Sequence, residues 1–303
     1  MRTSFRRYPL PVAVGLLAAL ATAAAASAVQ HDPWQTAVPV APVNSASAEG
    51  CPIESPDGSQ LFIASTRGAG GDQDIWVATR PETDAPFGAP VELPAPVNSA
   101  ANDYCPTPLR GKSLLFVSDR GGTDAYGTQA CGSGDIYVTR LNPGKDQWSV
   151  PRNLGCVAQG GPNGPGGEFG PSVVETDAGT QLFFSSGGAM GTNTQDIYVS
   201  NERADGNFGA RTLIAELNTA NDDAMPNVRK DGLEVVLTSN RPGGHGAFDI
   251  WSSTRASVYA GWTTPVNLGT AVNGAGPETR PSLSWKAGRL YFGRAGEIFV
   301  STR

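Results

Sequence analysis

Histidine, helical patterning and positive charge are all scarce in this sequence, and each absence excludes a class of function. The only histidines are His31, near the start, and His245, in a glycine-rich turn. Neither a histidine pair nor a Ser-His-Asp set is therefore expected. A Gly-x-Ser-x-Gly motif and a phosphate-binding glycine loop are absent as well. Catalysis by these common routes is not expected.

A sustained helical period is absent after residue 28, and the one long apolar run stands at the start. Residues 12–26 are rich in Ala and Leu, follow a basic start, and lead into Ala26-Ser27-Ala28. This pattern predicts a signal peptide over residues 1–28, cleaved after Ala28. A membrane anchor is the alternative, but the run is short for a span and polar sequence follows it. We expect residues 29–303 to form one secreted or periplasmic domain without a membrane span.

Positive charge is scarcer still once that segment is removed. It carries three arginines and no acid, so the remaining chain has 19 basic and 28 acidic residues, a formal charge of −9. Such an acidic surface repels nucleic acid and anionic membranes. We expect a monomer that binds neither, and its charge is compatible with neutral or cationic partners.

Glycine and proline are plentiful instead, and the prolines mark a repeat. The sequence has 38 Gly and 24 Pro, which suits a fold with many tight turns. Five prolines that each open a short strand are spaced 54, 65, 55 and 55 residues apart, namely Pro52, Pro106, Pro171, Pro226 and Pro281. A period of this length indicates a propeller or a solenoid. The units start near residues 51, 105, 170, 225 and 280.

Each unit is predicted to contain four strands. After the proline come a Gly turn, an apolar run such as residues 114–117, a third strand such as residues 135–138, and a short outer strand. The last unit stops after its third strand, whereas a spare outer-strand phrase stands at residues 34–42. We therefore predict an all-β, five-bladed β-propeller of four-stranded blades, whose ring closes when the N-terminal strand pairs into the last blade. A linear solenoid is the alternative, but it leaves the spare strand unexplained.

Several short motifs recur in these units. They are Ser55-Pro-Asp-Gly58, Ser118-Asp-Arg120, Gly134-Asp-Ile-Tyr137, Ser239-Asn-Arg-Pro-Gly-Gly244 and Pro265-Val-Asn-Leu-Gly269. They resemble the WD-like repeat of TolB-type and peptidoglycan-associated β-propeller proteins, over about residues 34–303. The resemblance implies a propeller that serves as a binding scaffold, without naming its ligand.

An acidic residue stands three positions before each repeat proline. The five acids are Glu49, Asp103, Glu168, Asp223 and Glu278. We expect them to ring one face of the propeller near the channel mouth, where each acid caps backbone N–H groups of a turn. The alternative is that this ring is a binding face for a ligand such as a sugar or a cation, for example calcium. In four blades an Asn precedes the acid by five residues, at Asn44, Asn98, Asn218 and Asn273.

Acids also open the third strands of the units. These acids are Asp74, Asp135, Asp196, Asp249 and Glu297. Arginines lie across the predicted hairpin from them, at Arg67, Arg120, Arg241 and Arg294. We expect salt bridges between the two sets, or turn caps.

Four cysteines lie on one side of the predicted ring. Cys51 and Cys105 hold the same position in adjacent blades, whereas Cys131 and Cys156 lie in two enlarged loops of the second blade. Four cysteines allow three pairings. An exported protein can keep them oxidised, and we favour Cys131–Cys156 and Cys51–Cys105. Zinc held by four thiolates is the alternative, but the sequence lacks a CxxC pair, so no metal or other cofactor is expected.

The two enlarged loops make the second blade the asymmetric part of the ring. Tyr126, Gln129, Asn163 and Glu168 lie in or next to them, and loops that break a repeat are candidates for binding. We predict a non-enzymatic, exported scaffold that binds a protein or glycan of the cell envelope through this face. The alternative is a carbohydrate-active enzyme, a glycoside hydrolase or lyase, that uses two acids at the channel mouth. A glycoside hydrolase needs one carboxyl group with a raised pKa and one with a low pKa. The five acids repeat in equivalent positions, so the sequence gives no reason for their pKa values to differ.

Overall fold

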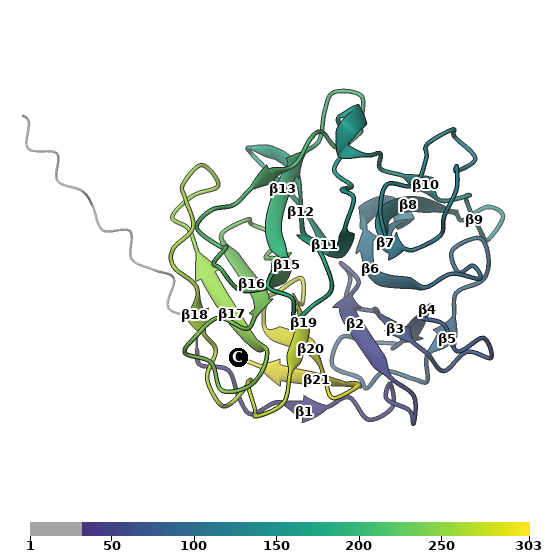
Figure 1. Cartoon of the computed structure of the whole chain (residues 1–303). Helices are drawn as coiled ribbons and strands as arrows, with labels where there is room; N and C mark the ends of the chain where they lie inside the picture. The colour runs from purple at the N-terminus through teal and green to yellow at the C-terminus, as the bar shows by residue number, and fades with distance from the viewer. Residues whose placement is uncertain (1–31) are drawn as a thin grey trace, which may run out of the picture. The chain divides into compact units, whose positions relative to one another are not determined.

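Short antiparallel strands make up almost all the regular structure of residues 32–303, the part of the chain that this computed structural model describes. They form five sheets around a central axis, with two short 3-10 segments, η1 (Arg110–Lys112) and η2 (Val157–Gln159) (Figure 1). The fold is a five-bladed β-propeller, as predicted. The predicted signal peptide lies outside the described residues. Among those described, no helix is long and apolar enough to span a membrane.

Each blade is a sheet whose innermost strand lies next to the channel. The first blade contains β2 (Glu49–Glu54), β3 (Gln60–Ser65), β4 (Asp74–Thr79) and β5 (Val91–Glu92). The second contains β6 (Asp103–Leu109), β7 (Ser113–Ser118), β8 (Asp135–Asn142) and β10 (Arg152–Asn153), with β9 (Gln147–Trp148) also paired to β8. The third contains β11 (Gly167–Thr176), β12 (Gly179–Gly187), β13 (Asp196–Asn201) and β14 (Thr212–Leu213). The fourth contains β15 (Asp223–Val228), β16 (Glu234–Ser239), β17 (Asp249–Thr254) and β18 (Val266–Asn267). The fifth contains β19 (Glu278–Leu283), β20 (Arg289–Arg294), β21 (Glu297–Thr302) and β1 (Val38–Pro39).

The fifth blade joins the two ends of the described chain. Val38 of β1 lies opposite Val300 of β21, and Pro39 lies opposite Phe299 (Figure 1). The N–H of Val40 continues the pairing with a 2.9 Å bond to the Ile298 carbonyl. Proline is tolerated here because an outermost strand needs no N–H on its free edge. The prediction that residues 34–42 close the ring is confirmed.

The antiparallel order of the strands gives the ring two faces. The loops from second to third strands and the segments that lead into the innermost strands lie on one face, which we call the loop face. The turns from first to second strands, and from third to fourth, lie on the other, which we call the hairpin face.

Adjacent blades pack through the apolar runs of their middle strands. Phe116 of β7 and Tyr137 of β8 are buried against Phe62 and Ile75 of the first blade. Each such aromatic or aliphatic side chain stabilises the fold by roughly 2 kcal/mol. Because a neighbouring blade covers each face, these strands are apolar without alternation, which explains their continuous hydrophobic runs.

Every innermost strand is interrupted just before its repeat proline. The residues at this point have positive φ angles between 49° and 58°, namely Cys51, Cys105, Gly170, Met225 and Arg280. The pairing register with the second strand shifts at the same place in each blade. Together with the prolines that follow them, these five residues line the central channel.

Candidate functional site

The five acids of the predicted binding face lie at the loop-face ends of the innermost strands, and all are buried. Each forms an ion pair with an arginine of its own blade. The pairs are Glu49–Arg67 at 2.8 Å, Asp103–Arg120 at 2.6 Å, Glu168–Arg211 at 3.3 Å, Glu278–Arg294 at 2.7 Å, and Asp223–Arg241. Buried carboxylates in such pairs are withdrawn from a ligand at the surface.

These arginines correct one prediction from the sequence. We expected either salt bridges between these arginines and the acids of the third strands, or turn capping by those acids. The structure pairs all four with first-strand acids. In three blades a serine at the end of the second strand turns the guanidinium inward, as Ser65 does by accepting the Nε–H of Arg67 at 2.9 Å, whereas Arg294 itself ends its strand opposite Glu278. Two of the five third-strand acids cap turns instead: Asp135 accepts the N–H of Cys131 at 2.7 Å, and Asp249 accepts that of Gly246 at 3.0 Å.

The first-strand acids also cap the turns that precede them. Asp103 accepts the N–H of Ser99 at 2.7 Å, and Glu278 accepts that of Gly274 at 3.1 Å. Within residues 32–303, no group of three or more His, Cys, Asp or Glu side chains is placed to hold a metal ion. The geometry favours a structural role for this ring of acids, and its use as a binding face stays a prediction.

Glu168 differs from the other four acids. The third blade has Ser186-Gly187 where other blades carry the arginine, so Arg211 approaches from the segment before β14 instead. Burial raises the pKa of Glu168 to about 8. Its Oε2 atom is buried without a hydrogen-bond partner among the described residues. Because Glu168 is fully buried, it is the acid in the ring that is most readily held in its protonated form.

Asn163 belongs to the repeat and not to the irregular loops. It lies five residues before Glu168, and its side chain bonds to both backbone groups of Ile136, at 3.0 and 3.2 Å. Asn98 makes the same two bonds to Ile75 in the first blade. The motif therefore has five copies where sequence analysis counted four, and the spacing of five residues was the signal for the missing one. Asn163 is completely buried.

The enlarged loops of the second blade are tied together as predicted. Cys131 and Cys156 form a disulfide with a Cα–Cα distance of 5.4 Å. A hollow of about 380 Å³ lies between Gln129, Cys156 and the third blade. Tyr126 is outside this hollow, is 56 % exposed, and donates its hydroxyl to the carbonyl of Val150. These side chains are placed at a surface, and whether they bind a ligand is a prediction.

The second predicted disulfide, between Cys51 and Cys105, is also present, with a Cα–Cα distance of 4.8 Å. It joins the first two innermost strands inside the channel. Within residues 32–303 no free cysteine is left to hold zinc.

The hairpin face of the ring carries adjoining hollows, and sequence analysis did not select it. Three adjoining hollows there have volumes of about 340, 550 and 330 Å³, and Pro56 lines all of them. The central hollow is the channel mouth. The sequence does contain a signal for this face. The fourth residue after the repeat proline varies from blade to blade while the residues around it repeat; in four blades it is Pro56, Arg110, Lys230 and Trp285.

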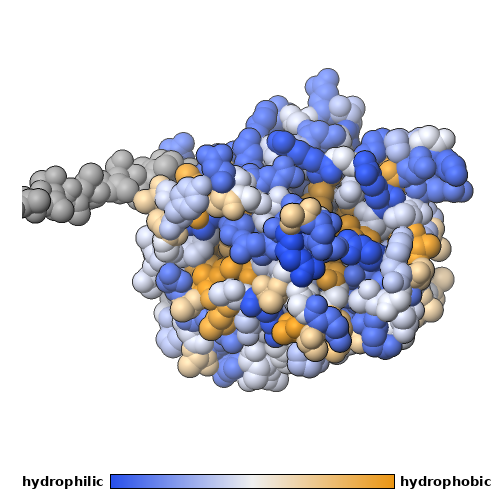
Figure 2. Space-filling model, turned by 90° about the horizontal axis from the view of Figure 1, so that it is seen from above, coloured by the Kyte–Doolittle hydropathy of each residue, from blue (hydrophilic) through white to orange (hydrophobic). Residues whose placement is uncertain are grey.

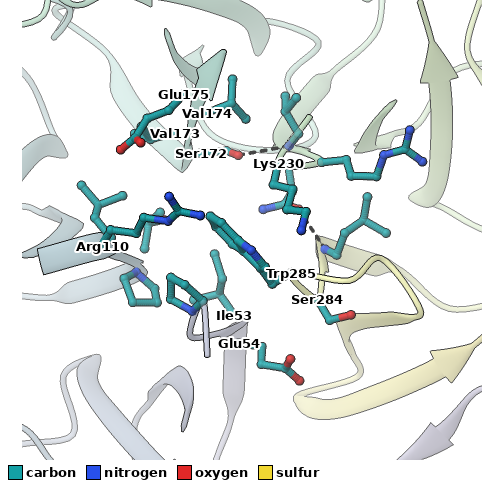
Figure 3. Close-up of a pocket in the computed structure, with 18 of the residues that line it drawn as sticks. Ile53, Glu54, Arg110, Ser172, Val173, Val174, Glu175, Lys230, Ser284 and Trp285 are labelled. Atoms are coloured by element: carbon teal, nitrogen blue, oxygen red, sulfur yellow. Dashed lines mark hydrogen bonds between the residues drawn. The ribbon is translucent and has the colours of Figure 1, made fainter. Parts of the chain in front are cut away.

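Trp285 stands in the middle of the mouth, with Arg110 on one side and Lys230 on the other (Figure 3). The Arg110 guanidinium is 5.0 Å from the indole ring and the Lys230 ammonium is 5.6 Å from it. In the described part of the chain no ion pair engages either cation. Two exposed acids lie at this rim, Glu175 and Asp231, and Asp231 is bound by Arg229 at 2.8 Å. Glu54, deeper in the mouth, is bound by Arg80 at 2.8 Å. The mouth thus presents two cations held over an aromatic ring.

Lysine is distributed on one side only. The sequence has four lysines, all of them exposed on turns of the hairpin face: Lys112, Lys145, Lys230 and Lys286. A view at right angles to Figure 1 shows a mostly hydrophilic surface in which hydrophobic residues form separate patches (Figure 2). The position of the four lysines therefore distinguishes the hairpin face from the loop face.

Comparisons with known proteins support the fold. No family model matches the chain, and no curated protein matches its sequence. The endo-arabinase from Bacteroides thetaiotaomicron VPI-5482 is 16% identical, with a TM-score of 0.54 over 88% of this chain and 96% of that one. The alpha-L-arabinofuranosidase from Lactobacillus brevis is 11% identical, with a TM-score of 0.52 over 88% and 94%. TolB from Acinetobacter baumannii is 14% identical, with a TM-score of 0.43 over 86% and 56%. At these identities the similarity concerns the propeller fold alone.

Proposed function

We propose that this protein is an exported, non-enzymatic binding propeller whose hairpin face takes up an acidic segment of a partner protein. The observation that carries the proposal is the position of Trp285 between Arg110 and Lys230 in the channel mouth. Two disulfides support export, because oxidising compartments maintain them.

A polypeptide suits this mouth better than a sugar. The two cations lie over the indole ring, so its surface is less open to stacking with a pyranose. Trp and Arg are also the residues that dominate protein–protein binding energies when they stand at the centre of a hollow. The net charge of the chain favours neutral or cationic partners, but recognition depends on the charges at the mouth, and these favour carboxylates.

The adjoining hollows support an extended ligand. The 550 Å³ hollow runs between the first two blades and shares Leu109 and Arg110 with the mouth. The 330 Å³ hollow lies between the fifth and first blades and shares Trp285 with it. A peptide segment that crosses the mouth would therefore fill recesses on both sides.

The alternative function, glycoside hydrolysis, has in its favour the propeller fold shared with the endo-arabinase and the arabinofuranosidase. That chemistry needs two carboxylates on either side of a sugar bond. The acids of the loop face are buried and bound to arginines, which weighs against it. Release of reducing sugar from an arabinan panel, abolished by Glu168→Gln or Asp103→Asn, would favour the enzyme over the scaffold.

Binding of poly-L-glutamate, measured by isothermal titration at low salt, tests the scaffold. We expect Trp285→Ala and the double variant Arg110→Gln/Lys230→Gln each to weaken binding tenfold or more. Tyr126→Ala, on the second-blade loops of the loop face, is the control and should bind as the wild type does. Equal loss in all variants, or binding of polygalacturonate and not of poly-L-glutamate, would contradict the proposal.

A further inference from the structure

A narrow chamber continues from the mouth into the channel. It has a volume of about 30 Å³ and shares Ile53, Thr107 and Asn227 with the mouth. This volume accommodates about two water-sized groups. Its wall consists of the repeat prolines, which have no N–H to donate, the residues at positive φ, and four residues that follow the prolines: Ile53, Thr107, Asn227 and Ser282. Among all these residues only Arg280 carries a charge.

Two aromatic rings pack against the guanidinium of Arg280. Tyr104 and Phe169 lie 5.4 and 5.8 Å from it, and their own centroids are 5.8 Å apart. Both rings follow directly on acids at the loop-face ends of their strands. The two rings therefore lie on the loop-face side of the innermost strands, whereas the chamber adjoins the mouth through the residues that the two hollows share.

Arg280 has no carboxylate partner in the described part of the chain. Its Nη1 contacts the sulfur atoms of the Cys51–Cys105 disulfide, at 2.7 Å from that of Cys105. Among residues 32–303 no acceptor engages Nε or Nη2. This contrasts with Arg67, whose guanidinium reaches a carboxylate, a hydroxyl and a carbonyl.

A cation without a counter-charge is costly for a fold even where it is partly buried, as Arg280 is. Withdrawal from water lowers the pKa of Arg280 to about 10, and Tyr104 offsets this only in part. The cation–π contacts with Tyr104 and Phe169 offset part of this cost but supply no formal negative charge. A bound anion would supply the missing charge and use the open N–H groups.

We propose that Arg280 and the surrounding channel wall form a binding site for a single carboxylate group. A carboxylate has two oxygen atoms, which matches both the volume of the chamber and the paired donors of a guanidinium. The site is distinct from Arg110 and Lys230 at the mouth. Its occupant is either a small free carboxylate or the carboxylate of a ligand that enters through the mouth.

Thermal unfolding in sodium formate tests the site at constant ionic strength. Wild-type protein should gain about 3 °C in Tm for each tenfold rise in formate above its Kd. Sodium methanesulfonate is too bulky for the chamber and should give no such gain. The gain should persist in Arg110→Gln and disappear in Arg280→Gln. An equal gain with methanesulfonate, or in Arg280→Gln, would overturn the proposal.

A second measurement does not depend on the folding of a variant. Formamide has the size of formate without its charge, so it should leave the Tm of the wild type unchanged; an equal effect of the two would refute a carboxylate site. Titration of poly-L-glutamate with and without formate then identifies the source. Competition indicates that a ligand carboxylate reaches Arg280, whereas independent binding indicates a free small anion. If poly-L-glutamate fails to bind while formate stabilises, the proposed function fails and this site stands.

Discussion

Asn44 pairs with both backbone groups of Ile298, a residue 254 positions away in the chain. Its Oδ1 accepts the N–H of Ile298 at 2.7 Å, and its Nδ2 donates to the carbonyl at 3.0 Å. In the first blade the same two bonds join Asn98 to Ile75, only 23 positions apart. The ring is thus closed by the interaction that organises each ordinary blade.

Deletion of residues 29–44 should strongly destabilise the protein. It removes β1, the buried Val43 and the two bonds of Asn44, and it exposes the edge of β21. We expect a loss of at least about 5 kcal/mol, from cavity and hydrogen-bond terms together, measured by calorimetry. Deletion of residues 29–33 alone is the control and should leave Tm within 2 °C, because Asp32 and Pro33 are exposed. An unchanged Tm in the longer deletion would rule out closure by this strand.

Asn163→Ala should cost about 3 kcal/mol in the free energy of unfolding. The substitution leaves the N–H of Ile136 without a partner in a buried position, whereas the Ile136 carbonyl keeps the bond from the Leu154 N–H, and it leaves a cavity at a fully buried site. Asn142→Ala, which removes one exposed turn bond to Gly144, should cost less than about 1 kcal/mol. Chemical denaturation of both variants measures the difference; equal costs would show that the Asn163 contact is not structural.

The buried ion pair of Asp223 and Arg241 should be sensitive to loss of one partner. Arg241→Met leaves a buried carboxylate unpaired, and we expect destabilisation by about 3–5 kcal/mol. The exposed pair Arg203–Asp205, at 3.6 Å, is the control: Arg203→Met should cost about 0–1 kcal/mol. Urea unfolding of the two variants compares them, and a small cost in Arg241→Met would argue against the structural role of the acid ring.

The pH dependence of stability should report on Glu168. Its pKa rises from an ordinary 4.5 to about 8 in the folded state, so folding favours the protonated acid. Stability from this group is full below pH 4.5 and is lost as pH rises to about 8, by roughly 1 kcal/mol per pH unit. Glu168→Gln carries no charge and should flatten that part of the Tm profile. Glu175→Gln, at an exposed position, is the control; a profile of Glu168→Gln that parallels the wild type would contradict the assignment.

The Cys131–Cys156 disulfide should stabilise the fold by constraining the unfolded chain. It closes a loop with a sequence separation of 25, so the double variant Cys131→Ser/Cys156→Ser should lose about 3 kcal/mol. The double variant Cys51→Ser/Cys105→Ser removes the other disulfide, whose cysteines are 54 residues apart, and its loss of stability is compared with that of the first variant. Peptide mapping without reductant checks the pairing first, and four free thiols would contradict both bonds.

Much of the architecture could be predicted because it depends on patterns of residues that are close together in the sequence. A proline at a period of about 55 residues, an apolar run after a Gly turn, and one spare outer strand were sufficient for five blades and for closure at residues 34–42. The disulfides followed from the blade alignment, since Cys51 and Cys105 occupy equal positions. Such features depend on residues close in sequence or repeated in register.

The arginine pairs, the mouth and Arg280 could not be predicted in the same way. The repeat puts Arg67 near both Glu49 and Asp74, and only the side-chain path through Ser65 selects Glu49. Arg280 and Cys51 occupy the same repeat position, yet Cys51 forms a disulfide whereas Arg280 is a cation in the channel wall.

The sequence by itself therefore determined the number of blades, their closure and the overall negative charge, because periodicity and composition need no coordinates. Only the tertiary structure decided where the adjoining hollows lie and which charges meet there. Arg110, Lys230 and Trp285 come from three separate blades, and their convergence depends on how the ring closes. Contacts of that kind follow from packing in three dimensions, so a repeat that predicts each blade cannot predict them.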